Sequence, residues 1–226
     1  MAMKTKEQYL ESVRRQAPEL YSFGARVTDL GSHPCFKPPL DAIGLVYDLS
    51  ARQDYEDLLT AQSPFTGGKV SRFVHILADR EDLARRFRAS RYLVHKHGAC
   101  VGARCVSTGA LNSTYAATFD MDQKLGTHYH ARFISFLKQV QENDLAVAGA
   151  MMDVKGDRSK SPGGQTEPDS YLRVVEKRKD GIVVRGAKAS ISGAVIANEI
   201  VVLPCTALKP EEAAYAVCFA VRSDAP

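Results

Sequence analysis

Apolar residues recur at helical spacing along the first two thirds of the chain. Tyr9, Leu10 and Val13 fall on one side of the first predicted helix. Thr5 can cap this helix, and Pro18 ends it. The same spacing predicts further helices over residues 39–49, 55–59, 70–97, 99–125 and 130–143. We therefore predict an N-terminal helical bundle that forms a domain over residues 1–143.

From about residue 144 the pattern changes to short runs of β-branched and aromatic residues. Strands are predicted over residues 171–176, 182–185, 200–203 and 215–221, and the dipeptide at 180–181, Asp-Gly, is a hairpin turn signal. The connector before them, residues 153–169, is rich in Gly, Pro, Ser and charge, as surface loops and ligand-binding segments are. The fold class is therefore α+β, with part of an antiparallel β-domain over residues 144–226.

The predicted β-layer is small for an independent domain. Four strands leave much of one face, or an edge, exposed unless something covers it. Another polypeptide chain is the simplest candidate for that cover.

The net charge of +4 arises from acids and bases that are interspersed along the chain, which gives nucleic-acid binding no support. The densest basic run, residues 80–96, has apolar residues at helical intervals. This favours a solvated helix face over contact with an anionic ligand or partner.

No apolar run approaches the ~20 residues of a membrane span, and the start lacks the apolar core of a secretory signal. We expect a cytoplasmic protein without membrane contact.

Common nucleotide and hydrolase motifs do not occur in the sequence. There is no GxxxxGKS/T, no GxGxxG after a strand, no GxSxG and no HExxH. The remaining candidates for chemistry are a cysteine pair, four histidines and the charged loop over residues 151–158. The histidines, which are more often capping or surface residues than ligands, are His95, His97, His128 and His130.

Cys100 and Cys105 lie in the small-residue stretch HGACVGARCVS. Five cysteines in a chain of this length argue against a disulfide framework, so free thiols or metal ligands are expected. On an undistorted helix, residues five apart point about 140° away from each other, at about 100° per residue. A π-type turn at Gly102 would bring them into register. Packing and metal binding both stay open on spacing alone.

The loop over residues 151–158, MMDVKGDR, joins the predicted helical and β parts. It is either a solvated turn or a segment whose backbone amides and Arg158 hold an anionic ligand. Sequence physics does not decide between these two interpretations.

Two long stretches resemble the 4-hydroxybutyryl-CoA dehydratase (vinylacetyl-CoA isomerase) family. They are YHARFISFLKQVQENDLAVAGAMMDVKGDR, residues 129–158, and LRVVEKRKDGIVVRGAKASISGA, residues 172–194. EQYLESVRR near the start, DQKLGTHYH and the final YAVCFAVRSDA extend the resemblance over essentially the whole chain. It corresponds to the N-terminal half of the family's usual length.

The resemblance implies an FAD enzyme of the 4-hydroxyphenylacetate 3-hydroxylase superfamily, arranged like acyl-CoA dehydrogenases, with a C-terminal helical domain outside this chain. It also implies a 4Fe-4S cluster whose first two ligands match Cys100 and Cys105, although the spacing is one residue wider than the family's CxxxC. The implied cofactor-binding residues are Met151, Met152, Asp153, Lys155, Gly156, Asp157, Arg158, Lys188 and Ser192.

The implied reaction is a radical dehydration of a hydroxyacyl-CoA. In it the flavin takes a hydrogen, the cluster binds the substrate hydroxyl as a Lewis acid, and a histidine from the C-terminal half is the base. We therefore expect a lyase subunit completed by a second polypeptide in a hetero-oligomer. The alternatives are half of an FAD-dependent aromatic monooxygenase, which lacks the cluster, and a non-catalytic assembly subunit in which both cysteines only pack.

Overall fold

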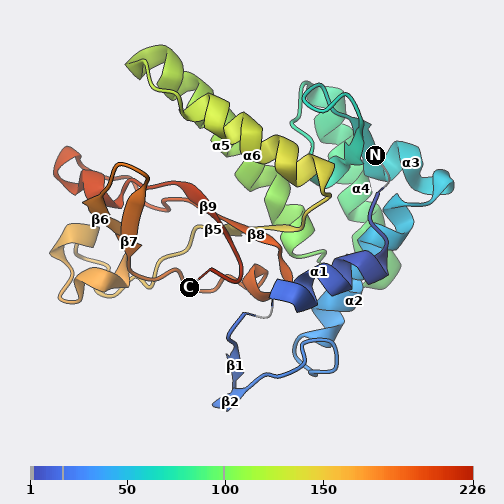
Figure 1. The fold of residues 1–226 in the computed structure, drawn as a ribbon, viewed down its shortest axis with the longest axis horizontal. Helices are drawn as coiled ribbons and strands as arrows, with labels where there is room; N and C mark the ends of the chain where they lie inside the picture. The colour runs from blue at the N-terminus through green and yellow to red at the C-terminus, as the bar shows by residue number, and fades with distance from the viewer. Residues whose placement is uncertain (1–2, 17, 99, 226) are drawn as a thin grey trace.

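The computed structural model describes residues 3–16, 18–98 and 100–225, which form a helical part and a β-rich part (Figure 1). The helices are α1 (Lys6–Gln16), α2 (Lys37–Ser50), α3 (Glu56–Leu59), α4 (Arg80–His97), α5 (Ala103–Leu125) and α6 (Tyr129–Glu142). Two small hairpins accompany them, β1 (Tyr21–Ser22) with β2 (Ala25–Arg26) and β3 (Thr60–Gln62) with β4 (Lys69–Ser71). The β-rich part contains β5 (Val147–Ala150), β6 (Arg173–Lys177), β7 (Ile182–Arg185), β8 (Glu199–Val202) and β9 (Phe219–Arg222). This mixture confirms the α+β class.

The predicted amphipathic helices form where local signals agree with burial. The Thr5 hydroxyl accepts a hydrogen bond from the Gln8 N–H at 3.3 Å, and Tyr9 and Val13 of α1 are buried. Prolines stand in the first turn of α2, where a missing N–H costs nothing. In the described part of the chain, no helix is both long and apolar enough to cross a bilayer.

The helix predicted over residues 70–97 is wrong for its first ten residues. There the chain forms β4, a 3-10 turn at Arg72–Val74 and an extended segment, and α4 begins only after Asp79 caps it. Val70, Phe73, Val74 and Ile76 of this segment are all buried, so their spacing carries no helical information. The buried Arg72 side chain also donates to the carbonyls of Asp57 and Leu58, which fixes a non-helical path.

The helix predicted from residue 99 starts at Ala103 instead. Gly98 ends α4 in the left-handed conformation, with φ of 72°, and its N–H donates to the Val94 carbonyl at 2.8 Å. Gly102, with φ of 48°, precedes α5. Cys100 therefore lies in a connector and Cys105 in the first turn of α5. The expectation that one helix, straight or with a π-type turn, carries both cysteines is wrong.

The largest sheet has the order β5-β8-β9, and β5 pairs with β8 in parallel. The expectation of a purely antiparallel β-region is wrong at this pair, while β8 with β9 and β6 with β7 are antiparallel as predicted. The sequence of β5, VAGA, is poor in β-forming residues and was not predicted as a strand. The parallel pairing is possible because residues 151–198 form a long crossover.

The last predicted strand is shorter than expected. Pro210–Tyr215 forms a 3-10 helix, and β9 begins at Phe219 rather than at residue 215. The β6–β7 hairpin lies close to its predicted place, with a register irregularity between Val174 and Glu176. In Figure 1 this hairpin lies at the end of the molecule opposite α1, α2, α3 and α4, and the β5-β8-β9 sheet lies between them.

Two apolar cores join helices to the β-rich part. One combines α1 and α2 with β5 and the turn before β8, and the other combines α5 and α6 with β5 and β8. Helix α5 approaches β5 so closely that a Cβ on Gly149 would lie 2.7 Å from Cγ1 of Val106. The domain boundary between residues 143 and 144 falls between α6 and β5 and stays a prediction.

Candidate functional site

The predicted flavin segment, residues 151–158, leaves the end of β5 directly and has no regular secondary structure. Lys155 and Gly156 both have positive φ, 75° and 40°. Gln165, which the sequence did not single out, fixes the turn: its Oε1 accepts from the Asp157 N–H at 3.0 Å, and its Nε2 donates to the Asp157 carbonyl at 2.9 Å. A Cβ on Gly156 would lie 2.4 Å from that Oε1, so glycine at this positive φ allows the Gln165 side chain to approach the turn.

Lys188 holds the start of the same segment. Its Nζ donates to the Asp153 carboxylate at 2.5 Å and to the carbonyls of Met151 and Leu203, both at 3.0 Å. The Lys188 and Asp153 side chains are 11% and 7% exposed, so this is a largely buried ion pair. All three N–H groups of the ammonium are used within the protein. The geometry makes Lys188 a brace for the segment rather than a free ligand contact.

Ser192 follows a stretch of chain that runs beside residues 151–158. The Ala189 N–H donates to the Met152 carbonyl at 2.9 Å, which places the stretch leading to Ser192 beside the segment. Ser192 itself is exposed, and so are Met151 and Met152. The exposed methionines offer an apolar surface, and Ser192 adds a hydroxyl on the neighbouring stretch of chain, a combination that ligand sites use.

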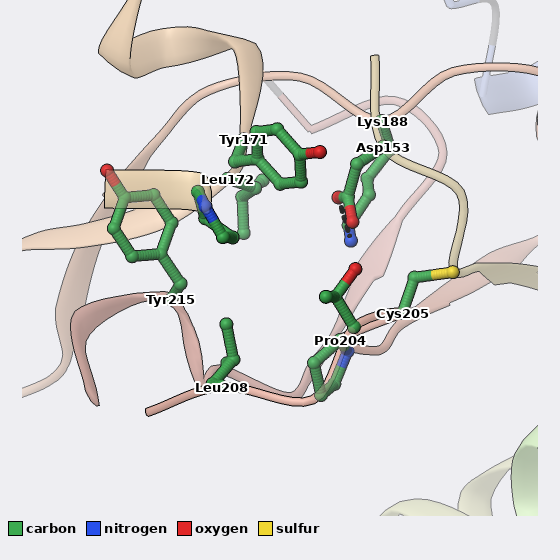
Figure 2. Close-up of a pocket in the computed structure, with 10 residues that line it drawn as sticks. Asp153, Tyr171, Leu172, Lys188, Pro204, Cys205, Leu208 and Tyr215 are labelled. Carbon is green, nitrogen blue, oxygen red and sulfur yellow. Dashed lines mark hydrogen bonds and ion pairs between the residues drawn. The ribbon is translucent and has the colours of Figure 1, made fainter. Parts of the chain in front are cut away.

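Two adjoining hollows open beside this segment, between it and the chain that follows β8. Figure 2 shows the narrower one, with the Lys188–Asp153 pair on one side and Tyr215 on the other. The wider hollow has a volume of about 310 Å³. Its lining residues are Asp153, Lys155, Arg158, Lys160, Ser161, Pro162, Tyr171, Cys205, Thr206, Ala207, Lys209 and Glu212. Lys160, Ser161 and Pro162 belong to the connector over residues 153–169, which was predicted as a surface loop or ligand-binding segment. The lining residues from 171 onward were not predicted as part of a site.

The two candidate metal ligands have different surroundings. Cys100 is exposed, whereas Cys105 is half-buried and its Sγ accepts a hydrogen bond from the Arg86 guanidinium at 3.1 Å. Arg86 also donates to the Cys105 carbonyl at 3.0 Å. Among the described residues, no three His, Cys, Asp or Glu side chains are grouped as a metal site would require. The structure thus offers two sulfur donors and no third ligand in its described part.

The candidate histidines are dispersed. His95 and His97 belong to the last turn of α4, where positive or polar side chains suit the helix end. His128 precedes α6, and the His130 ring lies 3.0 Å from the Thr118 hydroxyl and packs edge-on against Tyr115. The four histidines thus lie at helix ends or in the packing between helices.

Comparisons with known proteins agree over nearly the whole chain. Residues 5–226 match the family described as 4-hydroxyphenylacetate 3-hydroxylase N terminal. The 4-hydroxybutyryl-CoA dehydratase/vinylacetyl-CoA-Delta-isomerase of Clostridium aminobutyricum is 41% identical over 99% of this chain and 45% of its own length. The oxygenase component of 4-hydroxyphenylacetate 3-monooxygenase from Thermus thermophilus is 26% identical over the same shares.

Solved structures give the same result. An oxygen-tolerant archaeal 4-hydroxybutyryl-CoA dehydratase from N. maritimus superposes with a TM-score of 0.95 at 38% identity, covering 99% of this chain and 44% of that one. The oxygenase component of 4-hydroxyphenylacetate 3-monooxygenase, complexed with FAD and 4-hydroxyphenylacetate, superposes with a TM-score of 0.77 at 25% identity, covering 99% and 45%. The chain thus spans about half the length of these relatives.

These matches confirm the predicted resemblance to the 4-hydroxybutyryl-CoA dehydratases and its restriction to their N-terminal half. The relatives are dehydratase and flavin monooxygenase enzymes, so the chain is part of an enzyme family. It belongs to the 4-hydroxyphenylacetate 3-hydroxylase N-terminal family.

Proposed function

We propose that the chain is the N-terminal half of an FAD- and 4Fe-4S-dependent lyase that dehydrates a hydroxyacyl-CoA, as a 4-hydroxybutyryl-CoA dehydratase does. One observation carries the proposal: identity to the Clostridium aminobutyricum dehydratase is 41%, whereas identity to the Thermus thermophilus monooxygenase component is 26% over the same share of the chain. The N. maritimus dehydratase supports it with a TM-score of 0.95.

In this proposal residues 151–158 hold the flavin. The exposed side chains of Met151 and Met152 and the exposed Ser192 fit an isoalloxazine with a polar edge, and Lys188 keeps the segment in place. When bound, FAD supplies reversible electron and hydrogen transfer. The residues of this chain bind and orient it. A complex of the related oxygenase component with FAD supports the assignment.

Cys100 and Cys105 would supply two of the four ligands of the cluster. The donor set fits in kind, because thiolates hold iron–sulfur clusters and N–H groups such as those of Arg86 commonly bond to the ligating sulfur. When bound, the cluster supplies a Lewis-acidic iron. The other two ligands and the catalytic base belong to a C-terminal half.

We assign that C-terminal half to a second polypeptide. Apolar side chains are exposed on α5 and at the start of α6, where a covering chain would bury them. They are Val106, Phe119, Met121, Leu125 and Tyr129. The resulting enzyme is a hetero-oligomer with an active site shared between chains, and we place it in the cytoplasm.

Anaerobic purification from the native source tests the proposal. The expected result is a complex with a second chain, identified by mass spectrometry, that contains FAD, iron and acid-labile sulfide and dehydrates 4-hydroxybutyryl-CoA. An active complex without iron would contradict the dehydratase. A lone monomer would contradict the split enzyme.

The second candidate function is half of an FAD-dependent aromatic monooxygenase. It is supported by the superposition on the 4-hydroxyphenylacetate complex over 99% of this chain. An iron-free complex that hydroxylates a phenol with reduced flavin would establish it in place of the lyase.

A further inference from the structure

Arg86 departs from the solvated helix face that the sequence predicts for the basic residues of α4. Arg85 and Arg88 are exposed and pair with Glu81 at 3.0 and 3.1 Å. Arg86 is half-buried, on the side of the helix that also carries the buried Ala89. In the part of the chain that the structure describes, no carboxylate pairs with Arg86. Its positive charge is therefore available to another group inside the fold.

The group that Arg86 contacts is Cys105, the third residue of α5. One nitrogen of the guanidinium, Nη2, donates to the Cys105 carbonyl at 3.0 Å and to the Cys105 Sγ at 3.1 Å. The helix fixes the carbonyl, whereas the sulfur can turn about the Cα–Cβ bond. Two hydrogen bonds from one nitrogen therefore select one direction for the thiol. Arg86 thus orients one of the two sulfur donors proposed for the cluster.

The Nε–H group of the same guanidinium is buried and unused. It has no acceptor among the described residues. A buried donor without an acceptor costs about 1–3 kcal/mol, so such groups are uncommon in folded chains. A bound group with acceptor atoms beside Cys105 would remove this cost. The oriented sulfur, the uncompensated charge and the unused donor all fit a negatively charged group that binds at this end of α5.

We infer that Arg86 is a positioning residue of the proposed cluster, which orients the Cys105 thiolate and places a positive charge beside it. The inference rests on the proposed function for the cluster itself. Hydrogen bonds to a ligating sulfur withdraw electron density from that sulfur and raise the reduction potential. The sulfur then donates less to iron, and the iron is the stronger Lewis acid for a substrate hydroxyl. Through Arg86, the helical part of the chain both holds and tunes the group.

Three variants of the anaerobically purified complex test the inference. Arg86→Leu removes the charge and both hydrogen bonds, and Arg86→Lys keeps the charge without the planar guanidinium. Arg85→Leu, the matched control, removes the same charge one residue away on the exposed face. Two readouts do not depend on activity. One is the rate at which a chelator removes iron, and the other is the reduction potential, titrated with redox dyes and followed by electron paramagnetic resonance.

Arg86→Leu should lose iron to the chelator about tenfold faster, as is usual when an outer contact of a metal ligand is removed. Its reduction potential should fall by about 59 mV, which corresponds to a tenfold change in a one-electron equilibrium. Arg86→Lys should lie between Arg86→Leu and the unaltered complex in both measurements. Arg85→Leu should match the unaltered complex, because Glu81 and solvent already compensate the Arg85 charge.

An iron-loaded Arg86→Leu complex with unchanged iron release and unchanged potential would overturn the inference and leave the lyase standing. An equal shift in Arg85→Leu would also overturn it, since net charge rather than the contact with Cys105 would then be responsible. An unaltered complex without iron would refute the lyase, and the role of Arg86 with it. Circular dichroism of each variant separates these results from a loss of the fold, and Arg86→Lys provides the comparison if Arg86→Leu does not fold.

Discussion

The Arg104 guanidinium and the Asp144 carboxylate form an ion pair at 2.7 Å, with both side chains buried. Arg104 also lies over the ring of Tyr47, 3.9 Å from its centroid, and Tyr47 stacks on Tyr9 at 4.7 Å. The pair thereby joins the first turn of α5, which carries Cys105, to the turn that leads into β5 and the flavin segment.

Arg104→Met should destabilise the chain strongly, because it leaves the Asp144 charge buried and uncompensated. The expected loss is about 3–5 kcal/mol of unfolding free energy. Urea denaturation at pH 7 measures it, and Arg91→Met on the exposed face of α4 is the control. Asp144 has a φ of 41°, which Asn tolerates, so the double variant with Asp144→Asn should recover much of the loss. A decrease below about 1 kcal/mol in Arg104→Met would show that the pair is not a structural joint.

Lys188→Met should weaken FAD binding. Without the ammonium, the carbonyls of Met151 and Leu203 lose their shared donor and Asp153 is left unpaired, so the flavin segment shifts. We expect about a tenfold rise in the dissociation constant, measured by quenching of flavin fluorescence in the reconstituted complex. Lys177→Met on the exposed hairpin is the control. Equal affinities in both variants would refute the bracing role.

Much of the helical part was predictable, because an amphipathic helix such as α1 shows its buried face in the order of its residues. The segment around Arg72 was not, because its apolar residues are buried all round and the path depends on side-chain bonds to distant carbonyls. Strand β5 was not predictable either, because its parallel partner β8 begins 49 residues after its end and leaves no local pattern in the sequence. In the site, residues 151–158 were predictable from the family resemblance. Gln165 and Thr206 were not, because their places depend on contacts in the folded chain that the spacing of residues in the sequence does not reveal.

Gly149→Ala should destabilise the contact between α5 and β5. Its Cβ would lie 2.7 Å from Cγ1 of Val106, so the Val106 side chain, the helix or the strand must move. Overpacking of this kind costs about 1–3 kcal/mol. Adding Val106→Ala should restore most of it, and a double-mutant cycle measures the coupling. Gly109→Ala, on α5 with open space at its Cβ, is the control and should be neutral or stabilising. If the changes in unfolding free energy of Gly149→Ala and Val106→Ala simply add in the double variant, the close approach of α5 to β5 is contradicted.

Glu199→Gln should stabilise the sheet at neutral pH. Burial raises the pKa of Glu199 above its ordinary value, while Arg222 opposes that shift. Because the folded-state pKa of Glu199 lies above its unfolded-state pKa, ionisation of this carboxyl favours unfolding. The free energy of unfolding therefore decreases as the pH rises from the unfolded-state pKa through the folded-state pKa. The gain of the variant should be absent below about pH 4, near the ordinary glutamate pKa, and should grow as the pH rises above it. Thermal unfolding across this range measures it, and a gain that is independent of pH would contradict the argument.

Cys105→Ala and Cys100→Ala should both remove iron from the anaerobically purified complex. A cluster that loses one of four thiolate or imidazole ligands is poorly retained, so we expect iron to fall from about four per chain toward zero, with acid-labile sulfide falling in parallel. Cys35→Ala, an exposed cysteine in the connector before α2, is the control and should keep its iron. Circular dichroism separates loss of the cluster from loss of the fold. If either cysteine variant keeps iron, flavin and dehydratase activity, that thiol only packs beside Arg86 or in the connector, and the ligand must come from elsewhere in the enzyme.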